Sequence, residues 1–217
     1  MYAELWKQNV SPQREAAASG PKNAVLLGAM SAISARAFHA QARHLYGMDN
    51  SCVIDLASGA DKRRPENGSL LLSDALKPPF KEGSFRLAQT NFLLHMLTSP
   101  DNPARDEALA AFSDSTYRIL APGGHLVMCE TIGEVLPFVN HTDSPAGQAW
   151  REAMEDDVRR NLATAGFTNI AIEPAWLPRD ISYLTRHARQ PSIPRNRRTV
   201  GWGAFSVYAR KPEAIAM

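Results

Sequence analysis

Short apolar runs alternate along the chain with longer segments of helical periodicity. The apolar runs predict strands, because short stretches rich in Val, Ile, Leu and Phe between turn residues fit a buried sheet. Seven strands are predicted, over residues 23–30, 52–57, 69–75, 84–94, 124–131, 168–176 and 203–212. Regular alternation of strands with helices is typical of a parallel sheet covered on both faces, so the pattern predicts an α/β fold in three layers.

Helical periodicity is clearest in three segments between these runs. They span residues 31–47, 104–120 and 144–165. Residues that stop a helix lie at the end of each segment or just after it: Gly47, the turn Pro122-Gly123-Gly124, and Gly166. The link between the second and third strands is KRRPENG, in which Pro65 leaves room for no more than about one helical turn.

The composition predicts one domain over residues 1–217, since 217 residues that are 44% apolar suffice for one well-buried core. Lys and Arg number 24 and Asp and Glu 22, and the net charge of +2 argues against a nucleic-acid partner. No apolar stretch is long enough to span a membrane, and the N-terminus lacks the pattern of a signal peptide. Only two cysteines are present, which excludes a disulfide framework. We therefore expect a cytoplasmic protein that binds neither membranes nor nucleic acids.

Four stretches match the elements of one protein family in order. They are SDALKPPFKEGSFRLAQTNFLLHML, RILAPGGHLVMCE, the AGF before the sixth strand, and AFSVYARKP. From Asn23 to Pro212, the order and spacing of these elements resemble a class I S-adenosylmethionine-dependent methyltransferase. The resemblance implies a Rossmann-like, doubly wound sheet of seven mostly parallel strands, with the last strand inserted antiparallel. It also implies S-adenosylmethionine as the cofactor and S-adenosylhomocysteine as the product.

In this family the cofactor lies across the carboxyl ends of the first strands, as ligands do in doubly wound sheets. The resemblance implies eight cofactor-binding residues: Gly28, Ala29, Met30, Asp55, Leu56, Asp74, Ala75 and Asn91. The backbone amides after the first strand would hold the methionyl carboxylate, and Asp55 would accept the ribose hydroxyls. Asp74 and Ala75 would recognise the adenine edge, Leu56 would lie against its ring, and Asn91 would lie beside the sulfonium.

The glycine motif departs from the family pattern, which runs acid-x-Gly-x-Gly-x-Gly. Residues 26–32 of this chain keep Gly28, but the acid and two glycines are absent, and Met30 brings a large side chain. Two functions therefore stay open. One is in-line methyl transfer to a small-molecule acceptor, which needs alignment rather than a particular base. The other is a catalytically inactive, methyltransferase-like protein that serves as a binding or regulatory subunit.

A second register takes VIDLASGAD as the first strand and its motif, with Asp55 as the acid and Gly59 as a glycine. It leaves only KRRPENG for the following helix, so a strand-helix-strand unit cannot be built, and the first register is preferred. A nicotinamide-dependent oxidoreductase is disfavoured. It calls for a Gly-rich fingerprint and, in one class, for Tyr-x-x-x-Lys, which no tyrosine of this chain begins.

Histidines and arginines complete the candidate chemistry. His95 and His125 are interpreted as packing residues, no metal site is expected, and no catalytic residue is assigned. The long loop 177–202 is rich in arginine, which suits an anionic or aromatic acceptor. The alternative is that the loop forms a solvated basic surface or contacts a second copy or a partner protein. The segment 1–22 is expected to form a helical lid over the cofactor.

Overall fold

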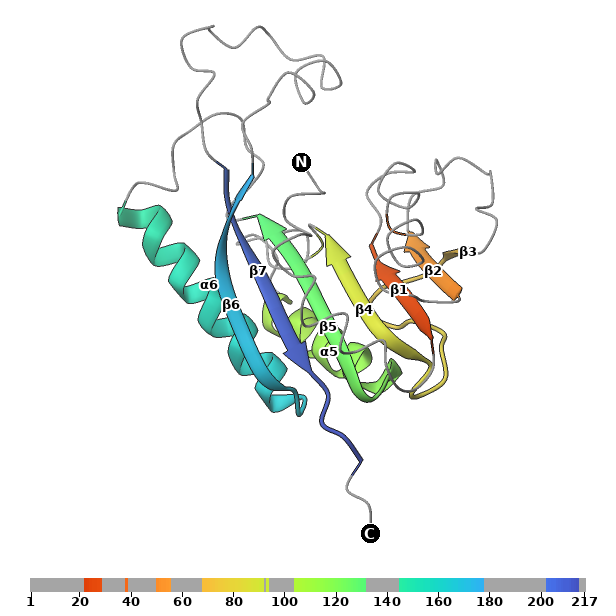
Figure 1. The fold of residues 1–217 in the computed structure, drawn as a ribbon. Coiled ribbons are helices and arrows are strands. Elements are labelled where there is room, and N and C mark those ends of the chain that lie inside the picture. The colour runs from red at the N-terminus through yellow and green to blue at the C-terminus, as the bar shows by residue number, and fades with distance from the viewer. Residues whose placement is uncertain are drawn as a thin grey trace, which may run out of the picture.

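The computed structural model describes residues 22–28, 38, 50–55, 68–91, 93, 104–131, 145–177 and 202–214. Their seven strands form one sheet in the order β3-β2-β1-β4-β5-β7-β6 (Figure 1). The strands are β1 (Asn23–Leu27), β2 (Asn50–Asp55), β3 (Gly68–Leu72), β4 (Phe85–Asn91), β5 (Leu120–Thr131), β6 (Thr168–Leu177) and β7 (Trp202–Arg210). Each overlaps one of the strand ranges that the sequence predicts.

The strand directions fit a doubly wound sheet with one reversed strand. β1 pairs in parallel with both β2 and β4, β2 with β3, and β4 with β5. β7 lies antiparallel between β5 and β6. The central position of Asn23–Leu27 confirms the first register, because the second register had placed the first strand at the position that β2 occupies.

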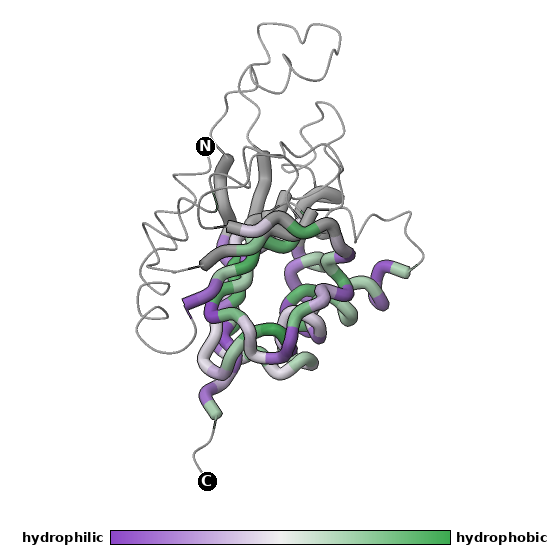
Figure 2. Tube along the Cα trace, turned by 90° about the vertical axis from the view of Figure 1, so that its right-hand side faces the viewer, coloured by the Kyte–Doolittle hydropathy of each residue, from purple (hydrophilic) through white to green (hydrophobic). Residues whose placement is uncertain are grey.

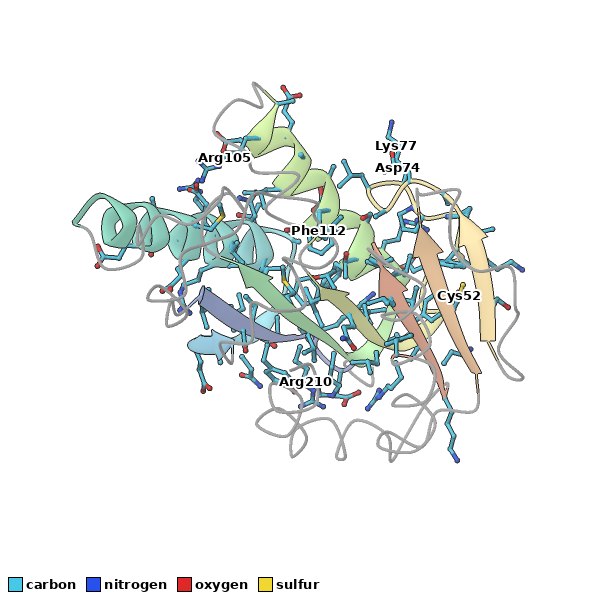
Figure 3. The ribbon with its side chains drawn as sticks, turned by 90° about the horizontal axis from the view of Figure 1, so that it is seen from above. Cys52, Asp74, Lys77, Arg105, Phe112 and Arg210 are labelled. Atoms are coloured by element: carbon cyan, nitrogen blue, oxygen red, sulfur yellow. The ribbon has the colours of Figure 1, made fainter. Side chains whose placement is uncertain are left out.

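Two described helices, α5 (Arg105–Ile119) and α6 (Pro145–Thr164), cover the same face of the sheet (Figures 2 and 3). Leu109, Phe112 and Ile119 recur at helical spacing on α5 and are buried in the core. Met154, Val158 and Leu162 do the same on α6. The sheet contributes alternate residues such as Val25, Ala88 and Leu126 to this core, because successive side chains of a strand point to opposite faces.

The opposite face of the sheet is apolar as well. Leu26, Leu87 and Val127 alternate with the residues of the helix-covered core, and none is more than 5% exposed. Phe38 is helical and 1% exposed, and it is not part of the core under α5 and α6. Apolar side chains are therefore buried on both faces of the sheet.

Two boundaries differ from the prediction. β5 begins at Leu120 rather than at residue 124. Leu120 directly follows α5 and already pairs with Phe85 of β4, so the glycine turn is an irregularity within the strand. Leu177 and Trp202, expected within the long loop, pair with each other as the ends of β6 and β7, so the connection spans 178–201.

Candidate functional site

Three of the predicted site residues form one row at the carboxyl edge of the sheet. Leu27 of β1 pairs with Ile54 of β2 on one side and with Thr90 of β4 on the other. The next residue on each of these parallel strands is Gly28, Asp55 and Asn91, so the register brings the three backbones side by side. β1 is the strand from which the sheet grows in both directions, and ligands of doubly wound sheets bind at such a switch point.

Gly28 takes a conformation that few other residues adopt. Its φ is +76°, and a Cβ added there would lie 2.9 Å from Cδ1 of the buried Leu93. A side chain at position 28 would therefore meet both backbone strain and the residue that packs beneath the turn. The one glycine that this chain keeps from the family motif is the one that its backbone requires.

Asp74 and Ala75 form a tight turn directly after β3. The Leu76 amide donates to Oδ1 of Asp74 at 2.8 Å, and the Lys77 amide donates to the Asp74 carbonyl at 3.2 Å. Ala75 is 3% exposed and belongs to the core, whereas the Asp74 side chain is exposed beside Lys77 (Figure 3). One alanine thus anchors the turn, and the carboxylate keeps acceptor capacity for a ligand.

The segment after this turn is held by the C-terminal end of α5. Arg118 donates from Nη1 to the Phe80 carbonyl at 2.7 Å and from Nη2 to the Pro78 carbonyl at 3.0 Å. The Gly83 amide donates to the Arg118 carbonyl at 3.0 Å. The sequence analysis missed Arg118. Its only local signal was a basic residue in the last turn of a helix, where it also suits the helix dipole.

Several predicted positions lie outside the described residues or are described by their backbone alone. Ala29, Met30, Leu56 and His95 lie outside, as do residues 1–21 and 178–201. For Asp55 and Asn91 the strand position is known and the side chain is not described. The described part of the candidate site therefore consists of the Gly28 turn, two strand ends and the Asp74 turn.

His125 lies at the other end of the sheet, where β5 follows the glycine turn. It is 4% exposed, and its Nδ1 contacts the Tyr208 hydroxyl. Burial, followed by the charges of Arg86 and Arg210, lowers the pKa of His125 from 6.5 to about 4. A neutral imidazole held by a tyrosine, far from the carboxyl edge, fits the predicted packing role.

Within the described ranges, no cluster of three or more His, Cys, Asp and Glu side chains is arranged to hold a metal ion. Of the helices in these ranges, none combines the length and apolar character needed to cross a membrane.

A parallel sheet with one antiparallel insertion, with a glycine turn beside Asp55 at its switch point, is typical of the Rossmann-like methyltransferase fold. The family described as "Methyltransferase domain" matches residues 25–128. Residues 25–128 thus match a methyltransferase domain, and the resemblance to class I S-adenosylmethionine-dependent methyltransferases is confirmed. Enzymes of this family use S-adenosylmethionine. No curated protein matches the sequence.

Solved structures agree in fold at low sequence identity. Phosphoethanolamine N-methyltransferase 2 of Haemonchus contortus, in complex with phosphomonomethylethanolamine and S-adenosylhomocysteine, is 14% identical with a TM-score of 0.58, over 96% of this chain and 53% of that one. The chain thus spans about half the length of that protein. Geranyl diphosphate C-methyltransferase of Streptomyces coelicolor is 12% identical, with a TM-score of 0.58, over 96% of this chain and 80% of that one. The cyclase SpnF is 18% identical, with a TM-score of 0.57, over 98% of this chain and 82% of that one.

Proposed function

We propose that this chain is an S-adenosylmethionine-dependent methyltransferase that acts on a small-molecule acceptor. The observation that carries the proposal is the row of Gly28, Asp55 and Asn91 at the switch point, where the register of three parallel strands aligns them. Asp74 follows β3, the strand next to β2, and so adds a second carboxylate at the same edge of the sheet.

The residues fit the cofactor by their chemistry. Gly28 allows the positive-φ turn that ends β1 over the Leu93 side chain, so the backbone can turn at the edge of the sheet where a ligand would bind. A carboxylate at position 55 suits two vicinal hydroxyls, and the exposed carboxylate of Asp74 suits an exocyclic amine. The amides of Ala29 and Met30 would hold the methionyl carboxylate, Leu56 and Ala75 would flank the adenine, and Asn91 would lie beside the sulfonium.

S-adenosylmethionine supplies an electrophilic methyl group on a sulfonium. What the chain itself contributes is orientation, because in-line transfer depends on holding the acceptor atom, the carbon and the sulfur in line in a site from which water is excluded. No side chain is assigned as a general base.

An anionic or aromatic acceptor is part of the proposal. The arginines between residues 178 and 201 suit carboxylates, phosphates and aromatic rings. Two of the similar structures support the anionic class, since their ligands are phosphomonomethylethanolamine and, by that protein's name, geranyl diphosphate.

The domain organisation is proposed along with the function. We take residues 1–217 as one cytoplasmic domain, with residues 1–22 as a lid and a second helical layer built around Phe38. Support for that layer comes from the buried residues Leu26, Leu87 and Val127 on the face opposite α5 and α6. Closure of both faces would complete the three-layer arrangement.

The alternative is a binding or regulatory protein that has lost methyl transfer. The missing acid and glycines of residues 26–32 favour it, and SpnF, named as a cyclase, supports the idea that this fold also serves other functions.

Calorimetric titration of the purified chain with S-adenosylmethionine and S-adenosylhomocysteine tests the proposal. We expect micromolar binding, together with a thermal shift, because a ligand that binds the folded state alone stabilises it. A screen of small anionic and aromatic acceptors with radiolabelled cofactor should then detect methyl transfer. No binding at millimolar ligand would favour the alternative, and binding without transfer to any acceptor would favour a regulatory role.

A further inference from the structure

Arg118 connects the end of α5 to the loop that follows the Asp74 turn. Its guanidinium reaches two carbonyls that lie far away in sequence, 2.7 Å to Phe80 and 3.0 Å to Pro78. A guanidinium carries its donors in a fixed, planar fork, so two bonds to one segment set both its position and its direction.

The same loop is anchored on either side of these bonds. Before them, Ala75 is buried in the core, and Asp74 closes its own turn through the amides of Leu76 and Lys77. After them, the Phe80 ring packs edge-to-face on Phe85, with centroids 4.7 Å apart. Between these two anchors, the Arg118 side chain bonds the loop to α5.

We propose that Arg118 is a positioning residue for the cofactor site: it holds the Asp74–Ala75 turn against the carboxyl edge of the sheet. The proposal rests on the proposed function, because it takes Asp74 and Ala75 as the residues that recognise adenine. Arg118 would not touch the cofactor; it would restrict the loop from which the recognising carboxylate projects.

The test compares matched arginines in the full-length chain. Arg118→Met removes both carbonyl bonds, and Arg118→Lys keeps the charge at the helix end but loses the fork. Both variants retain the backbone bond from Gly83 to the carbonyl of residue 118, so the loop keeps one tie to α5. Arg159→Met is the control, because the exposed Arg159 also donates to a backbone carbonyl, that of Ile170, at 3.0 Å on β6.

Two readouts separate positioning from general stability. Without ligand, the amides of Leu76 and Lys77 should exchange with solvent about tenfold faster in Arg118→Met, and at the wild-type rate in Arg159→Met. S-adenosylhomocysteine should bind about tenfold more weakly to Arg118→Met and with unchanged affinity to Arg159→Met. Arg118→Lys should lie between Arg118→Met and the wild type in both readouts.

The outcomes distinguish this proposal from the proposed function. Wild-type protein that does not bind S-adenosylhomocysteine overturns both. Wild-type binding that Arg118→Met leaves unchanged overturns the positioning role alone, as does unchanged exchange at Leu76 and Lys77. Equal losses of affinity in Arg118→Met and Arg159→Met would also overturn it, since both would then act through stability.

Discussion

The two ends of the sheet differ in how their charged side chains are bonded. At the amino end of β5, charged side chains bond to carbonyls of their own chain. Lys211 donates to the carbonyls of Tyr117 and Leu120 at 2.9 and 2.8 Å and lies 4.4 Å from the centre of the Tyr117 ring. Arg86 donates to the Pro122 carbonyl at 2.8 Å.

At the carboxyl edge, the described groups bond little beyond their own turn. Asp74 is exposed and bonds to the amides of its own turn, and Gly28 ends β1 with no side chain. The difference separates the charged groups that are bonded within the fold from the exposed group that we propose for a ligand. Buried charges that are satisfied internally stabilise the fold, whereas the exposed Asp74 carboxylate after β3 keeps acceptor capacity toward solution.

The largest effect is expected from Lys211→Met. Lys211 is 8% exposed, and burial lowers its pKa while the Glu82 carboxylate acts against that shift. Loss of the ammonium leaves two carbonyls at the end of α5 without their donor, so the free energy of unfolding should fall by about 3 kcal/mol. Urea titration should detect this, and affinity for S-adenosylhomocysteine should stay unchanged. Lys77→Met, at an exposed lysine, is the control; equal stabilities of the two variants would contradict the comparison.

Asp55→Ala should have the opposite signature. If Asp55 accepts from the two ribose hydroxyls as proposed, its removal should weaken S-adenosylhomocysteine binding by about 30-fold, measured by calorimetric titration. The melting temperature should stay within about 2 °C of the wild type. Asp114→Ala, at an exposed position of α5, controls for the loss of a negative charge. A large loss of stability with unchanged affinity would place Asp55 among the structural charges instead.

His125 predicts a pH dependence at the amino end of the sheet. Because its pKa falls from 6.5 to about 4 on folding, the unfolded chain binds more protons between these values. Stability is therefore fully present above about pH 6.5 and declines as the pH falls toward 4, by about 2 kcal/mol after allowance for solvent screening. Urea titrations at several pH values should show a flatter profile for His125→Gln. Parallel profiles would mean that His125 does not titrate in this way.

The smallest effect is expected from Asp157→Asn. Asp157 of α6 pairs with Arg105 of α5 and, at 2.6 Å, with Arg160 on its own helix. The pairs are partly exposed, so their loss should reduce the free energy of unfolding by about 1 kcal/mol without affecting ligand binding. The neighbouring exposed Asp156→Asn should have no measurable effect in the same urea titration. A loss above that of Lys211→Met would reverse the proposed ranking.

The strands and the carboxyl edge were predictable because their signals are local. Apolar runs such as NAVLL predict buried strands from neighbouring residues alone, and β1 extends over Asn23–Leu27 within the predicted range. The Asp-Ala pair after β3 could be identified from its motif. Gly166 also ends its helix as expected, with φ +101° and the Phe167 amide bonded to the Leu162 carbonyl at 3.0 Å.

The remaining features depend on contacts between distant residues. Arg118 and Lys211 meet their carbonyl partners only after the sheet has formed, and no spacing along the chain indicates which carbonyl a long side chain will reach. The start of β5 at Leu120 was missed for the same reason, since its partner Phe85 lies on another strand. Local periodicity cannot show a pairing that the partner strand creates.

The antiparallel insertion of β7 has a consequence for biosynthesis. Translation adds β7 after every other described strand, yet β7 lies between β5 and β6 and pairs with both. Until residue 210 leaves the ribosome, the nascent chain exposes the unpaired edge of β5 and cannot attach β6 to the sheet. Such edges template aggregation, so this half of the sheet stays vulnerable until β7 has been synthesised and paired.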